Sequence, residues 1–158
     1  RDDSQRLAVL HQLGILDTPR ESVFDNITQE ASRILETPIA MVSLLDKDRD
    51  WFKAVVGFNA TESAAETSFC NVFFAVKDDT VVIEDTLQDA RFATHPLVLD
   101  MPFIRFYAAV RLRAAGHTVG SLCVYDTRER RPATAQVRQL QALGDATVHA
   151  LQARATVH

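Results

Sequence analysis

The fold of this chain is decided by the stretch Ile104-Arg-Phe-Tyr-Ala-Ala-Val-Arg-Leu112. Its odd- and even-numbered residues form two different sets, and a repeat of two residues is the period of a β-strand whose two faces differ. Residues 113–117 break this alternation, and Gly116 can adopt the positive φ that a tight turn needs. A second strand follows and ends at Asp126. The two segments predict an antiparallel hairpin at the centre of a sheet, with Arg105 and Tyr107 on one face and an apolar opposite face.

Further segments extend this sheet and cover it. Strands are predicted over residues 39–45, 51–57 and 80–84, and helices over residues 1–14, 19–36 and 135–157. The sequence Thr18-Pro-Arg-Glu21 has the pattern of a capping box before the second helix. These elements predict an α+β fold, with an antiparallel sheet of five to six strands. We expect the two N-terminal helices and the long C-terminal helix on one face, and loops and short helices on the other.

Composition excludes several classes of function. The chain has 158 residues and a net charge of −4, which argues against binding to a nucleic-acid backbone. No apolar run has the length of a membrane span, so we expect no direct membrane insertion. Two cysteines make no disulfide framework, and a cytoplasmic location is expected. The five histidines lack the spacing of metal ligands, so no metal is predicted.

Several short motifs, distributed over nearly the whole chain, together resemble a known family. They are Leu13–Asp17, Pro38–Ala40, Asp48–Lys53 with Gly57, Ser68–Cys70, Asp85, Asp89–Phe92, Arg105–Tyr107 and Gly120–Asp126. The chain resembles the GAF domain, in particular the subgroup found N-terminal to bacterial histidine kinases and diguanylate cyclases. The resemblance covers about residues 5–151, so residues 1–158 are interpreted as a single domain. Asn71-Val72, Ala109 and Arg111 depart from the pattern of many members.

The resemblance implies a sensory module of a bacterial signal-transduction protein. A small ligand of unknown identity, or another signal, is expected to act between the sheet and the covering residues 58–103. No cofactor is predicted. The terminal helices are expected to form a homodimer and to pass the signal to a C-terminal effector domain, a kinase or a cyclase. The alternative is a ligand-free dimerisation module, whose pocket is filled by its own aromatic side chains.

Polar and aromatic residues of the motifs are the candidate ligand-binding residues. Long irregular segments of compact domains are often functional, which directs attention to residues 85–101. Asp89, Arg91 and Arg105 have a second interpretation as an internal salt-bridge network that fixes this segment. The candidates are Trp51, Phe69, Cys70, Asp85, Asp89, Arg91, Phe92, Arg105, Tyr107 and Cys123.

The two cysteines allow several interpretations. Cys70 and Cys123 are expected to lie on elements that approach each other, and free cysteines are usually small buried apolar residues. The alternatives are a thiol redox sensor, a site for covalent tetrapyrrole attachment, or an enzyme that resembles the methionine sulfoxide reductases of the superfamily. The histidine of the tetrapyrrole-binding members is absent after Cys70. No catalytic residue is predicted, and the isolated domain is interpreted as non-enzymatic.

Overall fold

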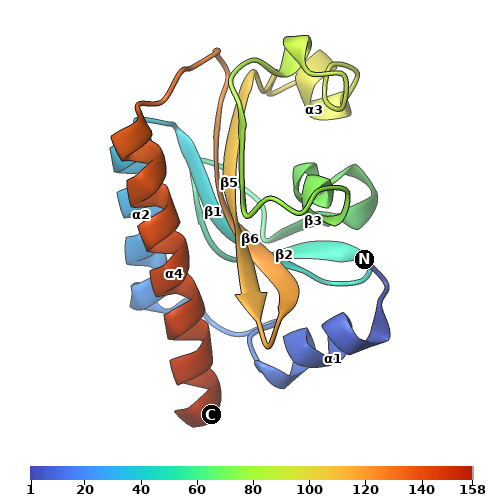
Figure 1. Cartoon of the computed structure of the whole chain (residues 1–158), viewed down its shortest axis with the longest axis vertical. Helices are drawn as coiled ribbons and strands as arrows, with labels where there is room; N and C mark the ends of the chain where they lie inside the picture. Colours follow the sequence, from blue (N-terminus) through green and yellow to red (C-terminus); the bar gives the residue numbers. More distant parts are fainter. Residues whose placement is uncertain (158) are drawn as a thin grey trace.

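The chain forms one six-stranded antiparallel sheet with helices on one side and shorter segments on the other (Figure 1). The computed structural model describes residues 1–157. In the sheet order β3-β2-β1-β6-β5-β4, the strands are β1 (Ile39–Leu45), β2 (Arg49–Val56), β3 (Glu62–Ala64), β4 (Thr80–Ile83), β5 (Phe106–Ala114) and β6 (His117–Asp126). The helices are α1 (Ser4–Gln12), α2 (Ser22–Leu35), α3 (Pro96–Leu99) and α4 (Thr134–Val157), with 3₁₀ turns η1 (Ala65–Thr67), η2 (Phe69–Phe74) and η3 (Thr86–Gln88). The predicted α+β class and the central β5–β6 hairpin are confirmed.

The alternation in β5 separates two apolar cores. Phe106, Ala108 and the other even-numbered residues of the strand face the helices, whereas Tyr107 and Ala109 face the covering segments. The prediction of one polar face was wrong. Tyr107 is fully buried among apolar side chains, and Arg105 lies before the strand begins. Both faces are buried because both are covered, which is the pattern of a sheet inside three layers, and Arg111 is a buried charged residue on the cover side of β5.

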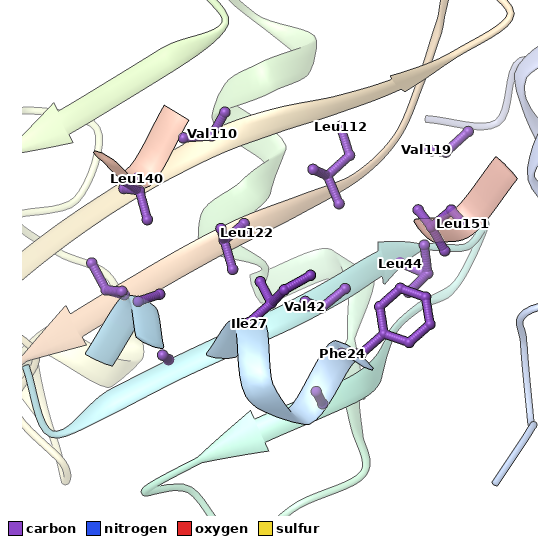
Figure 2. Close-up of a cluster of buried hydrophobic side chains, with 14 of the residues drawn as sticks. Phe24, Ile27, Val42, Leu44, Val110, Leu112, Val119, Leu122, Leu140 and Leu151 are labelled. Carbon is purple, nitrogen blue, oxygen red and sulfur yellow. The ribbon is translucent and has the colours of Figure 1, made fainter. Parts of the chain in front are cut away.

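The helix-side core joins α2 and α4 to the middle of the sheet. Figure 2 shows Phe24 and Ile27 of α2 beside Val42 and Leu44 of β1, and Leu140 of α4 beside β5 and β6. Gly144 allows α4 to lie close to the sheet, because a Cβ atom at this position would be 2.8 Å from Val110 Cγ1. Gly144 is therefore a packing residue inside a continuous helix.

Helix α1 lies across the end of the sheet rather than in the layer of α2 and α4 (Figure 1). Asp3 caps it, accepting hydrogen bonds from the backbone amides of Gln5 and Arg6. Arg6 is buried and donates from Nη1 to Leu45 O (2.6 Å) and Thr118 O (3.2 Å). This side chain therefore ties α1 to β1 and to β6.

The predicted capping box before α2 does not form. Helix α2 begins at Ser22, and Thr18 Oγ1 donates instead to Ile15 O (2.5 Å). Glu21 accepts from Lys53 Nζ (2.6 Å), whose side chain is fully buried. Leaving the Lys53 ammonium buried without a counter-ion costs more free energy than leaving the start of α2 without a side-chain cap. Glu21 therefore pairs with Lys53 and does not form the capping box. Within residues 1–157, no helix combines the length and the apolar character that crossing a bilayer requires.

Candidate functional site

The predicted charged candidates form two separate ion pairs at the edge of the sheet. Arg105 binds Asp85 through two hydrogen bonds of 3.0 Å, and Arg91 binds Asp89 locally at 2.8 and 3.0 Å. The bidentate contact with Arg105 lowers the pKa of Asp85 below its ordinary value. Asp85, Asp89 and Arg91 line an open groove of about 760 Å³, together with Glu129 and the exposed Arg131. The structure therefore has two separate ion pairs, and not the single salt-bridge network of Asp89, Arg91 and Arg105 that the sequence also allowed.

Trp51 does not lie with the other aromatic candidates. Its ring belongs to the helix-side core, whereas the neighbouring Phe52 faces the covering segments. The register between β1 and β2 shifts by one residue between Val42 and Ser43. At this β-bulge, Lys53 has no residue opposite it in β1. Neighbouring residues of a strand point to opposite faces, which separates the two rings, and the tertiary structure decides which ring faces which side.

The remaining aromatic candidates pack together beneath residues 58–104, the covering segments that form the cover of this face of the sheet. Phe69 of η2 stacks on Phe92 with ring centroids 5.0 Å apart, and contacts Tyr107 at 5.3 Å. Tyr125, which the sequence did not single out, lies 5.2 Å from Tyr107 and opposite it in the β5–β6 register. These rings fill much of the space between the sheet and its cover, so the candidate site is closed in this structure.

A cluster of thiol and hydroxyl groups lies beside these rings, on the face of the sheet that the cover packs against. Cys70 Sγ is 3.0 Å from Ser121 Oγ and accepts a hydrogen bond from Tyr107 Oη (3.3 Å). A hydrogen bond from Cys123 lowers the pKa of the Cys70 thiol, and burial raises the pKa of Cys123 well above its ordinary value. Both cysteines belong to the buried cluster between the sheet and its cover, and Cys123 Sγ donates to Met41 O (3.7 Å). Ser43, which pairs with Ser121 across the strands, has a buried hydroxyl without a hydrogen-bond partner among residues 1–157.

A small cavity of about 60 Å³ remains between the aromatic cluster and the edge of the cover. Apolar side chains form most of its wall, and Asp50, Ser63, Thr67 and Ser68 form the polar part. The apolar residues are Ile39, Met41, Phe52, Phe58, Phe69, Leu97, Pro102, Ile104 and Tyr125. An apolar wall with a few polar groups on one side is the usual character of a small-molecule site. A cavity of this size holds one or two waters, so a larger ligand requires the cover to move.

Asp50 is the charged residue of this cavity, and sequence reasoning missed it. Its side chain is 5% exposed and accepts hydrogen bonds from Arg1 and from Ser68 Oγ. Burial raises the pKa of Asp50 above its ordinary value, and the nearby charge of Arg1 opposes this shift. The strand was predicted to begin at Trp51, whereas β2 begins at Arg49, so the sequence prediction left Asp50 outside the strand in which it is buried.

Arg111 anchors the cover to the sheet. Its guanidinium donates to the carbonyls of Phe73 (2.7 Å), Val76 (2.9 Å) and Asp78 (2.8 Å) and to Thr118 Oγ1 (2.8 Å). The side chain is 4% exposed and lies over the Phe73 ring. This arginine, one of the departures from the family pattern, fixes the segment that follows η2. It satisfies carbonyl groups that a short 3₁₀ turn leaves free.

The comparison with known families follows from this architecture. The profile of the GAF domain matches residues 19–151. The chain belongs to the GAF domain family. This assignment agrees with the resemblance seen in the motifs, and the two terminal segments outside the match are the start of the chain through Thr18 and the last turns of α4.

Three similar proteins illustrate the family. A cyclic di-GMP phosphodiesterase of Pseudomonas aeruginosa is 39% identical over 132 residues, which cover 83% of this chain but only 22% of that protein. The GAF domain of an Acinetobacter phosphoenolpyruvate-protein phosphotransferase superposes with a TM-score of 0.71 at 15% identity, covering 98% of this chain and 97% of that one. The free methionine-R-sulfoxide reductase of Neisseria meningitidis, solved with its substrate, gives 0.69 at 16% identity, covering 95% and 90%. The last two likenesses show the fold alone.

Proposed function

We propose that this GAF domain is a non-catalytic sensory module of a bacterial signalling protein. It binds a small ligand in the space between the sheet and residues 58–104. The observation that carries this proposal is the cavity beside Asp50, where a buried carboxylate meets an apolar wall under a cover of short segments. The relative from Pseudomonas, of which this chain matches only about a fifth, supports a larger protein in which such a domain is joined to an effector.

Residues 58–104 include β3 and β4, which pair with the sheet, so opening concerns the segments η1, η2, η3 and α3. Arg111 of β5 holds the end of η2, whereas the bonds from His95 Nε2 to Thr67 O (2.8 Å) and from Thr86 Oγ1 to Ile104 O (2.7 Å) join covering segments to each other. Segments with few anchors open at a lower free-energy cost than the sheet that supports them. A ligand larger than the present cavity binds the open form, and ordering of the cover around it is the primary response.

Two sets of contacts connect the cover and the sheet with the terminal helices. Arg1, ahead of α1, donates to Asn71 Oδ1 of η2 (2.7 Å). Arg154 of α4 donates to Glu21 (2.6 Å), which also holds Lys53 of β2. A ligand changes the arrangement of α1 and α4 only if it binds one arrangement more tightly than the other. We place the output at these helices, which lead to a C-terminal effector domain and form a homodimer.

A specific observation favours a second function, that of a ligand-free dimerisation module. Phe69, Phe92 and Tyr107 occupy much of the space that a ligand would need. In this alternative the aromatic cluster is a permanent core, and the cover does not open. The contact between Cys70 and Cys123 favours a third candidate, a thiol-based redox function, although both thiols are buried.

Hydrogen exchange with a panel of soluble metabolites tests the leading proposal. A ligand is expected to slow exchange in residues 58–104 and to change protection in α4. Leu97→Trp is the matched control, because Leu97 lines the cavity and is partly exposed, so a larger ring enters the cavity without disrupting the sheet. The proposal fails if no compound changes protection in the parent chain, or if Leu97→Trp responds to the active compound in the same way.

A further inference from the structure

We propose that the cavity beside Asp50 binds the cationic group of an organic amine, and that this cation replaces Arg1, which contacts Asp50 but does not line the cavity, as the partner of the carboxylate. Asp50 is the counter-ion of the bound amine, and the apolar wall of the cavity holds the rest of the molecule. This inference rests on the proposed function. It adds the charge class of the ligand and a residue that competes with it.

The position of Asp50 requires a positive partner. The residue is 4% exposed, and its carboxylate meets Ser68 on one side and the guanidinium of Arg1 on the other. Separating a buried carboxylate from its cation carries a large penalty, because neither water nor a neutral side chain replaces the lost charge. Arg6, the other buried arginine nearby, directs its guanidinium to Leu45 O, Thr118 O and Arg1 O. A ligand that opens this site must therefore supply the cation that Arg1 withdraws.

Arg1 is placed to leave without disturbing the sheet. Its side chain belongs to the segment ahead of α1, and its other hydrogen bonds go to Asp46 O, Arg49 O and Asn71 Oδ1. All three acceptors lie at partly buried positions where water can replace the guanidinium. Loss of these bonds weakens the connection between α1 and η2, because Arg1 bridges the two elements, and it leaves the contact of Arg6 with the Phe74 ring (5.2 Å) in place. The exchange of Arg1 for an amine thus couples occupancy of the cavity to the position of a terminal helix.

The wall of the cavity favours an amine with an apolar or aromatic body. Phe52 and Phe58 meet edge to face with centroids 6.3 Å apart, and Met41, Phe69 and Leu97 complete the surface around them. Aromatic faces attract a cation held near them, which adds to the attraction of the carboxylate. An anion is disfavoured here, since it would bring a second negative charge into a poorly solvated site beside Asp50.

Benzylamine and benzyl alcohol are suitable probes, because they share one ring and differ in charge at neutral pH. Calorimetric titration of the chain with each compound measures the preference for the amine. We expect Arg1→Gln to bind benzylamine at least about tenfold more tightly than the parent chain, a difference of about 1.4 kcal/mol. Arg1→Lys is the matched control, because it retains a cation beside Asp50 and is expected to stay close to the parent. Asp50→Asn in the Arg1→Gln background is expected to abolish the preference for the amine.

Each other outcome overturns the inference. Equal binding of benzyl alcohol and benzylamine to Arg1→Gln removes the charge assignment, but it leaves the cavity as a ligand site and the proposed function intact. Binding of neither probe to any variant also removes it, and the metabolite panel with Leu97→Trp then decides the proposed function independently. If Asp50→Asn does not fold, as judged by circular dichroism, the comparison of Arg1→Gln with Arg1→Lys decides the question alone.

Discussion

Arg154, near the end of α4, donates from Nε to the Glu21 carboxylate at 2.6 Å, and the same carboxylate binds Lys53 Nζ at 2.6 Å. The side chain of Lys53 is fully buried and that of Arg154 is 12% exposed. One carboxylate therefore holds the sheet, the segment before α2 and the C-terminal helix together. Because an uncompensated buried charge is costly, this relationship is a sensitive point of the fold.

Removal of Glu21 is predicted to destabilise the protein strongly. Among residues 1–157, Glu21→Ala leaves Lys53 Nζ with Thr18 Oγ1 and the carbonyl of Pro19 as hydrogen-bond partners, and we expect a loss of about 3 kcal/mol in the free energy of unfolding. Adding Lys53→Met to this variant is expected to recover much of the loss, because the charge that needs a partner is gone. Urea denaturation of the single and double variants measures both effects. A loss below about 1 kcal/mol for Glu21→Ala would contradict the role assigned to this ion pair.

Close packing at Gly144 predicts that a better helix former is harmful there. Alanine in place of glycine normally stabilises a helix by about 1 kcal/mol. Here the new Cβ atom lies 2.8 Å from Val110 Cγ1, and overpacking of this kind costs about 1–3 kcal/mol. We expect Gly144→Ala to be destabilising and to be less so in a Val110→Ala background. A double-mutant cycle by thermal or urea unfolding measures the coupling, and strict additivity would show that α4 relaxes without contacting Val110.

Arg111 is predicted to be irreplaceable by lysine. A lysine ammonium cannot satisfy Phe73 O, Val76 O, Asp78 O and Thr118 Oγ1 from one position, because its donors lack the planar fork of arginine. Arg111→Lys is expected to cost about 2–4 kcal/mol and to speed hydrogen exchange in residues 69–79. Arg113→Lys, two residues along the same strand and 45% exposed, is the control and should change stability little. Equal effects of the two substitutions would refute the anchoring role.

The pH dependence of stability is predicted to carry a contribution from Asp50 that is opposite to the usual one. Its pKa is raised in the folded chain, so between the ordinary value of about 4 and the raised value the folded state binds more protons than the unfolded state. The stability that Asp50 contributes is therefore present at low pH and falls as pH rises through this window. Asp50→Asn removes this dependence, and a pH series of urea denaturation curves for both chains measures the difference. A difference that grows with pH would mean that the ion pair with Arg1 outweighs burial.

The two thiols are predicted to be unreactive in the native chain. Cys70 and Cys123 are 1% and 0% exposed, so a water-soluble thiol reagent should modify them only through opening of the cover. Rapid modification under native conditions, with loss of response to peroxide in Cys70→Ser and Cys123→Ser, would instead favour the thiol-based alternative.

Much of the architecture followed from local patterns. The alternation in residues 104–112 located the central hairpin and separated the two faces, because a strand with both faces covered repeats every two residues. The motifs identified the family, and Cys70 and Cys123 were expected on elements that approach each other. Arg105 and Tyr107 show the limit of such reasoning. The alternation assigned both residues to the same face of the sheet, but the ion pair with Asp85 shows that the Arg105 side chain lies at the edge of the sheet.

The sequence by itself indicated five of the six strands, but not β3, and it indicated which family the chain belongs to and which segments cover one face. Only the tertiary structure decided how the buried charges are compensated: Asp50 by Arg1, Lys53 by Glu21, and Arg111 by Asp79 together with three backbone carbonyls. The physical reason is that hydrophobic periodicity is a local property of the chain, whereas a counter-ion is supplied by any segment that the fold brings within hydrogen-bonding distance. The candidate site depends on such a contact, between residues 49 positions apart.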